Sequence, residues 1–394
     1  MIANNKTKKF KITPMIIGTL IAMICASTCS VLSFKMQGQK YNFKHGLFQT
    51  VLMFIGEFMN LIIFFGRIAY SPTATRKHLL AMDEEAKENN QSLQFTKLWI
   101  AIPCLIDMAA STCSLVSLLL MPASINTMFN GGIIVFTTII SRLIIKRPIM
   151  RHQALGCTFS AIGFVIVGIS ATVFKPMEDG YTLQGTILGI ILTLIYLVLV
   201  SFQGNIEELI VRRKAIDVQR MIGLEGMFGM IWALIAIMIA SFIPCPSDGL
   251  CSMGGYFEDP VMAVMEIATQ PGLAFFCFTA ACAVLVLNLT GLYLVKATSV
   301  VFKVFWSTLN IMVIWAVSVL LGLEGFDLNS ALVQMFGFVF LLLGNFTYSE
   351  IIVWPVPWIN VDIRKRDGDG IPDDPSLDPS VPNKDPNSIY TKEE

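Results

Sequence analysis

The sequence predicts an all-α membrane protein with ten transmembrane helices, and both its composition and its long apolar runs point to that class. Of the 394 residues, 55% are hydrophobic and only 14% are charged. A water-soluble domain could not cover so much apolar surface, because charge keeps a globular exterior hydrated. The apolar residues form runs of about 20, the length of a helix that crosses a hydrocarbon core ~30 Å thick. Barrel strands would be shorter and would alternate polar with apolar residues.

Ten apolar runs follow one another along the chain. Only Met121-Pro122 separates the third from the fourth, and a tight turn is expected there because Pro122 cannot supply the hydrogen bond of a continuous helix. The first run follows the basic segment "KKFK" and is too long for a signal-peptide core, so we expect it to remain as a membrane anchor. The predicted spans are 15–34, 47–70, 98–121, 123–145, 152–174, 184–206, 222–243, 272–294, 300–322 and 330–353.

Basic residues predict the orientation of these spans. If the N-terminus lies in the cytosol, all 28 Lys and Arg residues fall on the cytosolic side except Lys35, Lys40, Lys44 and Lys175. Positive residues gather on the cytosolic side of membrane proteins, so both termini are expected there. The formal net charge is zero, which gives no indication of a nucleic-acid partner.

A pattern in the fourth and fifth spans recurs in the ninth and tenth. Asn130 and Asn310 begin matching segments, and each is followed at almost the same distance by two glycines with the same spacing. Because each repeat would then hold five spans, an odd number, the two halves would have opposite orientations. Inverted repeats of this kind are typical of secondary transporters, which bind solute near mid-membrane between the halves. The glycines are Gly156 and Gly163 in the first segment, and Gly337 and Gly344 in the second.

Several motifs, in order along residues 47–350, resemble those of one transporter group. The chain resembles the drug/metabolite transporter superfamily (EamA-like), and within it the nucleotide-sugar-transporter-like F branch of solute carrier family 35, relatives of the chloroquine-resistance transporter. The motifs are "MFIGEF" (53–58), "CLIDM" (104–108), "NGGIIVFT" (130–137), "QGNIEELIV" (203–211), "GLEGMFG" (223–229), "FKVFWSTLNIMVIWA" (302–316) and "FGFVFLLLG" (336–344).

The resemblance implies ten helices arranged as two inverted five-helix repeats, 15–174 and 184–353. The tails lie outside it: we expect 1–14 in the cytosol, and the acidic, proline-rich composition of 354–394 predicts a disordered cytosolic tail. We expect an endomembrane location such as the Golgi, the vacuole or the lysosome. One departure concerns the substrate: related sequences tend to carry Arg where this chain has Asn130 and Asn310, which argues against an anionic substrate.

Three predicted spans carry polar residues at helical spacing. Lipid cannot hydrogen-bond such side chains, so each stripe must face protein or a watery cavity. Close helix packing is the favoured account of the hydroxyls, whereas Asn130 and Asn310 are bulkier, occupy matching positions and are interpreted as cavity residues. The stripes are Asp107, Ser111, Ser114 and Ser117 in the third span; Thr127, Asn130, Thr137 and Ser141 in the fourth; and Ser299, Lys303, Ser307 and Asn310 in the ninth. The candidate cavity residues are Asp107, Ser111, Ser114, Thr127, Asn130, Asn288, Ser307 and Asn310.

Asp107 and Glu57 are carboxyl groups within predicted spans. An ionised side chain near the bilayer centre costs at least about 2.5–3.5 kcal/mol on insertion scales, so such residues usually serve a function. A carboxyl group there can bind and release a proton as a cavity alternates its access; the alternative is a structural role in joining helices. The resemblance keeps Gln203 and Glu207 as candidate gate residues, whereas Glu208 and Glu225 are interpreted as structural.

The loop between the seventh and eighth spans contains Cys245 and Cys251, the only cysteines outside the predicted spans. If this loop faces an oxidising lumen, the two are close enough in sequence to form a disulfide across a Pro/Gly turn. The loop lacks further ligands for a metal, and no metal or other cofactor is expected.

The sequence therefore predicts a secondary active transporter of a small organic solute, working by alternating access with proton coupling or exchange. A G-x-x-x-x-G-K-[ST] motif is absent, so ATP is not expected to drive it. The alternatives are a receptor or scaffold that transports nothing, and a nucleotide-sugar antiporter. An enzyme is not expected, because there is no H-E-x-x-H motif and Asp107 with Glu57 is not a known catalytic pair. The expected partners are the solute and the lipid bilayer; the oligomeric state stays open.

Overall fold

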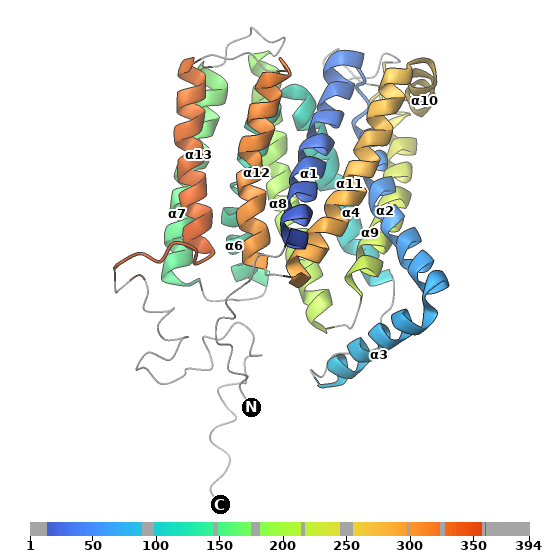
Figure 1. The fold of residues 1–394 in the computed structure, drawn as a ribbon. Helices are drawn as coiled ribbons and strands as arrows, with labels where there is room; N and C mark the ends of the chain where they lie inside the picture. Colours follow the sequence, from blue (N-terminus) through green and yellow to red (C-terminus); the bar gives the residue numbers. More distant parts are fainter. Residues whose placement is uncertain are drawn as a thin grey trace, which may run out of the picture.

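The chain folds into a bundle of long helices (Figure 1). The computed structural model describes residues 14–88, 98–144, 149–174, 182–213, 217–244, 255–297, 300–323, 328–356 and 359. Within these ranges, the only β-structure is an isolated antiparallel bridge between Pro244 and Tyr256. The all-α prediction is thereby confirmed. The predicted disulfide partners Cys245 and Cys251, and almost all of the C-terminal tail, lie outside the described residues.

The helices follow one another in the order that the apolar runs predicted. They are α1 (Pro14–Tyr41), α2 (Gly46–Tyr70), α3 (Pro72–Glu88), α4 (Leu98–Leu120), α5 (Ala123–Asn130), α6 (Ile133–Ile144), α7 (Arg151–Ile169) with the π-turn η1 (Ser170–Phe174), α8 (Leu183–Arg213), α9 (Val218–Ala240), α10 (Pro260–Thr269), α11 (Pro271–Ala297), α12 (Val300–Leu320) and α13 (Leu328–Tyr348).

Nine helical stretches in the described part are long and apolar enough to cross a membrane. They match nine of the predicted spans, with α5 and α6 together forming the fourth. α12 occupies the place of the remaining predicted span, 300–322, and its part Leu309–Leu320 is apolar. The chain is thus a multi-pass helical membrane protein, and the number ten stays a prediction.

The end of the first helix differs from the prediction. α1 continues to Tyr41, beyond the predicted end at residue 34, so Lys35 lies inside the helix and is fully buried. Its ammonium group donates to the backbone carbonyls of Leu118 and Met121, the latter at 2.6 Å. These carbonyls lie at the end of α4, where the turn at Pro122 leaves helix carbonyls without their usual partners. A buried lysine therefore caps a helix that a proline ends.

The predicted fourth span is divided into two helices. α5 ends at Asn130, and the next two residues, Gly131 and Gly132, form a turn before α6 begins. A Cβ atom at Gly132 would lie 2.6 Å from a ring carbon of Phe164, so a larger residue would collide with α7. The predicted span 123–145 is thus present, but a two-residue turn divides it and places Asn130 at a helix end.

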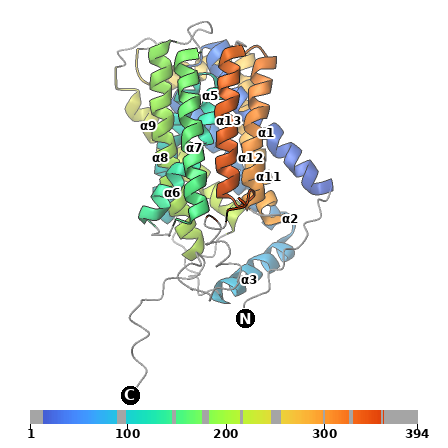
Figure 2. The same cartoon turned by 90° about the vertical axis from the view of Figure 1, so that its left-hand side faces the viewer.

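α7 and α13 pack against each other along glycines (Figure 1 and Figure 2). A Cβ atom at Gly156 would lie 2.7 Å from the carbonyl oxygen of Gly344, and one at Gly163 would lie 2.6 Å from that of Gly337. The first glycine of one helix thus faces the second glycine of the other. A pair of like helices related by a two-fold axis makes contacts of this reciprocal kind.

Small residues also bring α9 close to α2. Cβ atoms at Gly223 and Gly226 would lie 2.5 Å and 2.3 Å from backbone atoms of Leu61 and Phe58. Lipid tails are as apolar as leucine, so such close van der Waals packing, rather than escape from water, holds membrane helices together. This close packing of α2 on α9 places Phe58, the residue after Glu57, directly against α9.

Two short helices lie at opposite ends of the bundle, α3 at one and α10 at the other (Figure 1). α10 is tied to the start of α2 by a buried pair: Nδ1 of His45 lies 2.6 Å from Oε1 of Glu258, and both side chains are 1% exposed. The other carboxylate oxygen of Glu258 accepts the amide hydrogen of Leu47 at 3.1 Å. Glu266 of α10 lies 3.7 Å from the same ring; burial raises the pKa of this carboxyl group, and His45 lowers it.

Candidate solute cavity and acidic cluster

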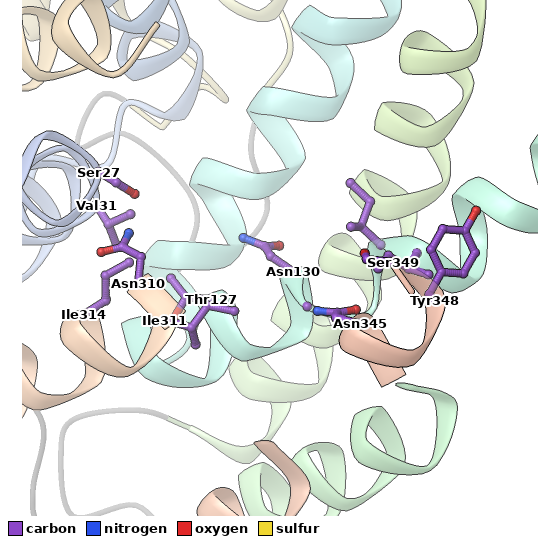
Figure 3. A pocket seen from close by; sticks show the side chains of 13 residues that line it. Ser27, Val31, Thr127, Asn130, Asn310, Ile311, Ile314, Asn345, Tyr348 and Ser349 are labelled. Atoms are coloured by element: carbon purple, nitrogen blue, oxygen red, sulfur yellow. The ribbon is translucent and has the colours of Figure 1, made fainter. Parts of the chain in front are cut away.

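A cavity of about 410 Å³ opens between α1, the α5–α6 break, α12 and α13 (Figure 3). That volume is typical of sites for small molecules. Ile133, Ile134, Ile311 and Ile314 supply much of its apolar wall. Its polar lining residues are Ser27, Thr127, Asn130, Asn310, Asn345, Tyr348 and Ser349. No charged side chain is among the described residues that line it, so the cavity offers hydrogen bonds without a formal charge.

Asn130 lies at the end of α5 and reaches the cavity from the broken span (Figure 3). Its Oδ1 atom is buried and has no hydrogen-bond partner among the described residues. An unpaired buried amide oxygen costs roughly 1–3 kcal/mol. A bound solute that donates a hydrogen bond would remove that cost.

Asn310 reaches the same cavity from α12, and it is held in place. The hydroxyl of Thr28, on α1, donates to Oδ1 of Asn310 at 3.2 Å, and both residues are buried. The two asparagines that occupy matching positions in the sequence therefore line one cavity, but only Asn310 is anchored by a hydrogen bond. Asn345 of α13 is a third amide in the lining.

A second polar region lies between α2, α4, α8 and α9, each of which supplies one carboxyl group. Asp107 interacts electrostatically with Glu57, Glu207 and Glu225, and Glu57 and Glu207 interact with each other. We call these four residues the acidic cluster. All four are half-buried, and Oε2 of Glu57 and Oε1 of Glu225 are enclosed without a hydrogen-bond partner.

Gln203 and Ser111 tie the acidic cluster together. Nε2 of Gln203 donates to Oε1 of Glu207 at 2.7 Å, and Gln203 also hydrogen-bonds to Asp107. The hydroxyl of Ser111 donates to Oδ1 of Asp107 at 3.1 Å. No described basic side chain forms an ion pair with any of the four carboxyl groups. Protons, a cation or water can offset their mutual repulsion.

The structure divides the predicted site residues between these two regions. Thr127, Asn130 and Asn310 line the cavity, whereas Asp107, Glu57 and Glu207 belong to the acidic cluster. Ser111 and Gln203 donate hydrogen bonds to members of that cluster. Ser114 and Asn288 are half-buried and do not line the cavity. The side chain of Ser307 lies outside the part of the chain that the structure describes.

Ser117 is the last residue of the polar stripe in the third predicted span, and it illustrates the alternative that the hydroxyls serve helix packing. Its hydroxyl lies 2.6 Å from that of Thr193 and 2.8 Å from the carbonyl oxygen of Gly189, both on α8. Nδ2 of Asn126 donates to it at 3.1 Å. Ser117 is fully buried, so it joins α4 to α8 and faces no cavity.

Sequence reasoning missed Thr28, Asn345 and the participation of Glu225. The polar residues of α1, Ser27, Thr28, Ser30 and Ser33, were the available signal, because an outermost lipid-facing helix would not need them. Glu225 occupies the turn between Gly223 and Gly226, the residues that let α9 approach α2. That approach brings the carboxyl group of Glu225 to Glu57, and only the packed structure reveals it.

Helices that cross a membrane, with polar groups enclosed between them, define an integral multi-pass membrane protein of the transporter kind. The chain is 27% identical to solute carrier family 35 member F6 of Homo sapiens over 313 residues, which cover 79% of this chain and 80% of that protein. The member F6 of Mus musculus is 28% identical over the same shares. These relatives bear out the predicted resemblance to the F branch of solute carrier family 35, and together with the apolar helices they support a membrane transporter of some solute.

A fission yeast protein provides a further relative. The uncharacterized protein C12G12.12 of Schizosaccharomyces pombe is 29% identical over 268 residues, which cover 66% of this chain and 76% of that protein. No protein-family profile matches the chain. The relatives named as solute carriers are transporters rather than enzymes, in keeping with the prediction of a non-enzymatic protein.

Proposed function

We propose that the chain is a secondary active transporter that moves a small, uncharged organic solute by alternating access. The observation that carries this proposal is the cavity between α1, α5–α6, α12 and α13, which is lined by three asparagines and by no described charged residue. A nucleotide sugar would bring phosphate charges, and those are usually held by Arg or Lys. The lining therefore favours a neutral solute over the nucleotide-sugar alternative.

Alternating access is supported by the way the helices pair. If 15–174 and 184–353 are inverted repeats, α7 corresponds to α13 and α2 to α9, and each of these pairs packs together. The remaining strong pairs, α1 with α11 and α4 with α8, would exchange under the same two-fold axis. The reciprocal glycine contacts of α7 and α13 fit that symmetry. Two such halves can rock about a central site, which is how inverted repeats move solutes.

The acidic cluster is proposed as the coupling site, with the proton as the coupling ion. α2 and α4 come from one proposed half, and α8 and α9 come from the other. Four unpaired carboxyl groups repel one another, so taking up a proton would draw these helices together and releasing it would loosen them. Solute exchange without protons is the alternative mode, and a receptor that transports nothing is the alternative function.

The orientation and membrane remain as the sequence predicts: both termini in the cytosol and an endomembrane such as the Golgi, the vacuole or the lysosome. In the proposed orientation, α10 and the His45–Glu258 pair lie on the non-cytosolic side.

Transport by the purified full chain in sealed vesicles tests the proposal. Uptake of labelled neutral, cationic and anionic solutes should be measured with and without an imposed pH gradient. We expect a neutral solute to accumulate and the gradient to increase its accumulation. If no solute crosses in either condition, the receptor alternative replaces the proposed function; if only nucleotide sugars cross, the nucleotide-sugar alternative does.

A further inference from the structure

The two cavity asparagines differ in how their amide groups are used. Oδ1 of Asn310 is occupied by the Thr28 hydroxyl at 3.2 Å, and this is the single hydrogen bond that its side chain makes with the described residues. Its Nδ2 makes no hydrogen bond with a described residue, so it is the end of this amide that is left for a solute in the cavity that Asn310 lines. The hydroxyl of Thr28 therefore sets which end of the Asn310 amide faces a solute.

Asn130 has no such anchor. Neither end of its amide makes a hydrogen bond with a described residue, and Oδ1 is buried without a partner. On α8, which would be the counterpart of α1 in the proposed repeat, the hydroxyl of Ser201 lies 3.0 Å from that of Thr137. That hydroxyl pairs with α6 and leaves Asn130 unheld, so one of the two matching asparagines is fixed and the other is free.

We propose that Thr28 is a positioning residue that presents Nδ2 of Asn310 as a fixed hydrogen-bond donor, while Asn130 supplies the acceptor. The cavity then selects an uncharged solute with adjacent donor and acceptor groups, such as a primary amide or a polyol. This inference rests on the proposed function and adds the chemistry of its substrate. A carboxylate would meet the unpaired oxygen of Asn130, and an ammonium group would meet the donor of Asn310. Each charged group would thus leave one of the two amides unsatisfied.

Three probes with the same carbon chain and different terminal groups distinguish these cases: D-gluconamide, D-gluconate and D-glucamine. Binding to the purified full chain is measured by calorimetry, and uptake is measured in vesicles. Leaving one buried hydrogen-bonding group unpaired lowers affinity roughly tenfold. We therefore expect gluconamide to bind at least about tenfold more tightly than either charged probe.

The variants Thr28→Val and Thr28→Ser isolate the hydroxyl. Thr28→Val keeps the volume and should weaken gluconamide binding about tenfold, while Thr28→Ser should restore it. Thr19→Val is the matched control on the same helix, because the exposed hydroxyl of Thr19 donates only to its own helix at Met15. Since a general loss of packing would weaken all three probes equally, the ratio of gluconamide to gluconate affinity is the deciding readout.

Asn310→Asp provides a second variant if Thr28→Val does not fold. The carboxylate can still accept from Thr28 but has no donor for the solute, so preference should move from gluconamide to glucamine. The inference would be overturned if all three probes bound equally, or if a wild type that transports another solute did not bind gluconamide. An unchanged ratio of gluconamide to gluconate affinity in Thr28→Val would overturn it too. A wild type that transports nothing would instead refute the proposed function.

Discussion

The cavity and the acidic cluster are both polar regions inside a membrane bundle, and they solve the problem of burial differently. The cavity contains amides and hydroxyls, and among them Oδ1 of Asn130 is enclosed without a described hydrogen-bond partner. The acidic cluster holds four carboxyl groups with no described basic partner, joined by Gln203 and Ser111. A neutral site suits reversible contact with a solute, whereas unpaired carboxyl groups respond to protons. In the proposed function, the cavity recognises the solute and the acidic cluster couples its transport to protons. Substitutions in either region can test this division.

The largest expected effect is on coupling. Asp107→Asn keeps the shape and the hydrogen bond from Ser111 but removes the titratable group that interacts with the other three. We expect accumulation of solute under a pH gradient to fall by about tenfold or more, with the folded fraction unchanged. Glu84→Gln, a change to an exposed carboxyl group on α3, is the matched control. Wild-type accumulation with unchanged pH dependence in Asp107→Asn would remove this residue from the mechanism.

The next effect concerns charge in the cavity. Asn130→Arg with Asn310→Arg would place two guanidinium groups around a neutral space, and each binds phosphate or carboxylate through paired hydrogen bonds. We expect the preference to shift from a neutral solute towards a nucleotide sugar, measured as the ratio of uptake rates in competition. A wild type that already prefers the anion would contradict the account of a neutral cavity.

A smaller effect should define the boundary of the acidic cluster. Glu225→Gln removes the carboxyl group that the sequence alone assigned to a structural role. If Glu225 takes part in coupling, the pH dependence of uptake should change while the apparent affinity for the solute stays within about twofold, because the cavity is elsewhere. A variant that loses stability but keeps the wild-type pH profile would restore the structural interpretation.

The smallest effect belongs to the packing hydroxyls. Ser117→Ala removes contacts to Thr193 and Gly189 at a residue that belongs to neither region, and a hydrogen bond of this kind stabilises by about 1 kcal/mol. We expect a slightly lower thermal midpoint and unchanged uptake. A clear loss of transport at normal stability would mean that the stripe of the third span faces a pathway after all.

The sequence predicted the helices because the length of an apolar run can be read from neighbouring residues. It predicted the turn at Pro122 because the missing amide hydrogen of proline also acts locally. It also identified Asn130 and Asn310 from repetition alone. It did not find the break after Asn130, nor the contact with Phe164 of α7 that leaves no room for a Cβ atom at Gly132. Nor did it find the burial of Lys35, whose partners are carbonyls of another helix.

The sequence identified many residues of the candidate sites, but it did not predict how these residues are arranged. Asp107 and Asn130 stood out as costly residues within apolar spans, but their separation into two regions depends on which helices pack together. Glu225 carries no unusual signal in the chain itself, and the polar residues of α1 do not by themselves single out Thr28. Glu225 gains its neighbours through the close approach of α2 and α9, and Thr28 gains its role through contact with a residue 282 positions away.

Solute counterflow compared with accumulation in the same vesicles tests most directly whether recognition and coupling are separate. In counterflow, labelled solute exchanges for unlabelled solute without any gradient, so it needs the cavity and the rocking motion but no proton uptake. We predict that Asp107→Asn, which resembles the protonated state, keeps counterflow and loses accumulation under a pH gradient, whereas Asn130→Leu loses both. If Asp107→Asn abolishes counterflow as completely as Asn130→Leu does, the two regions act as one site and the account is contradicted.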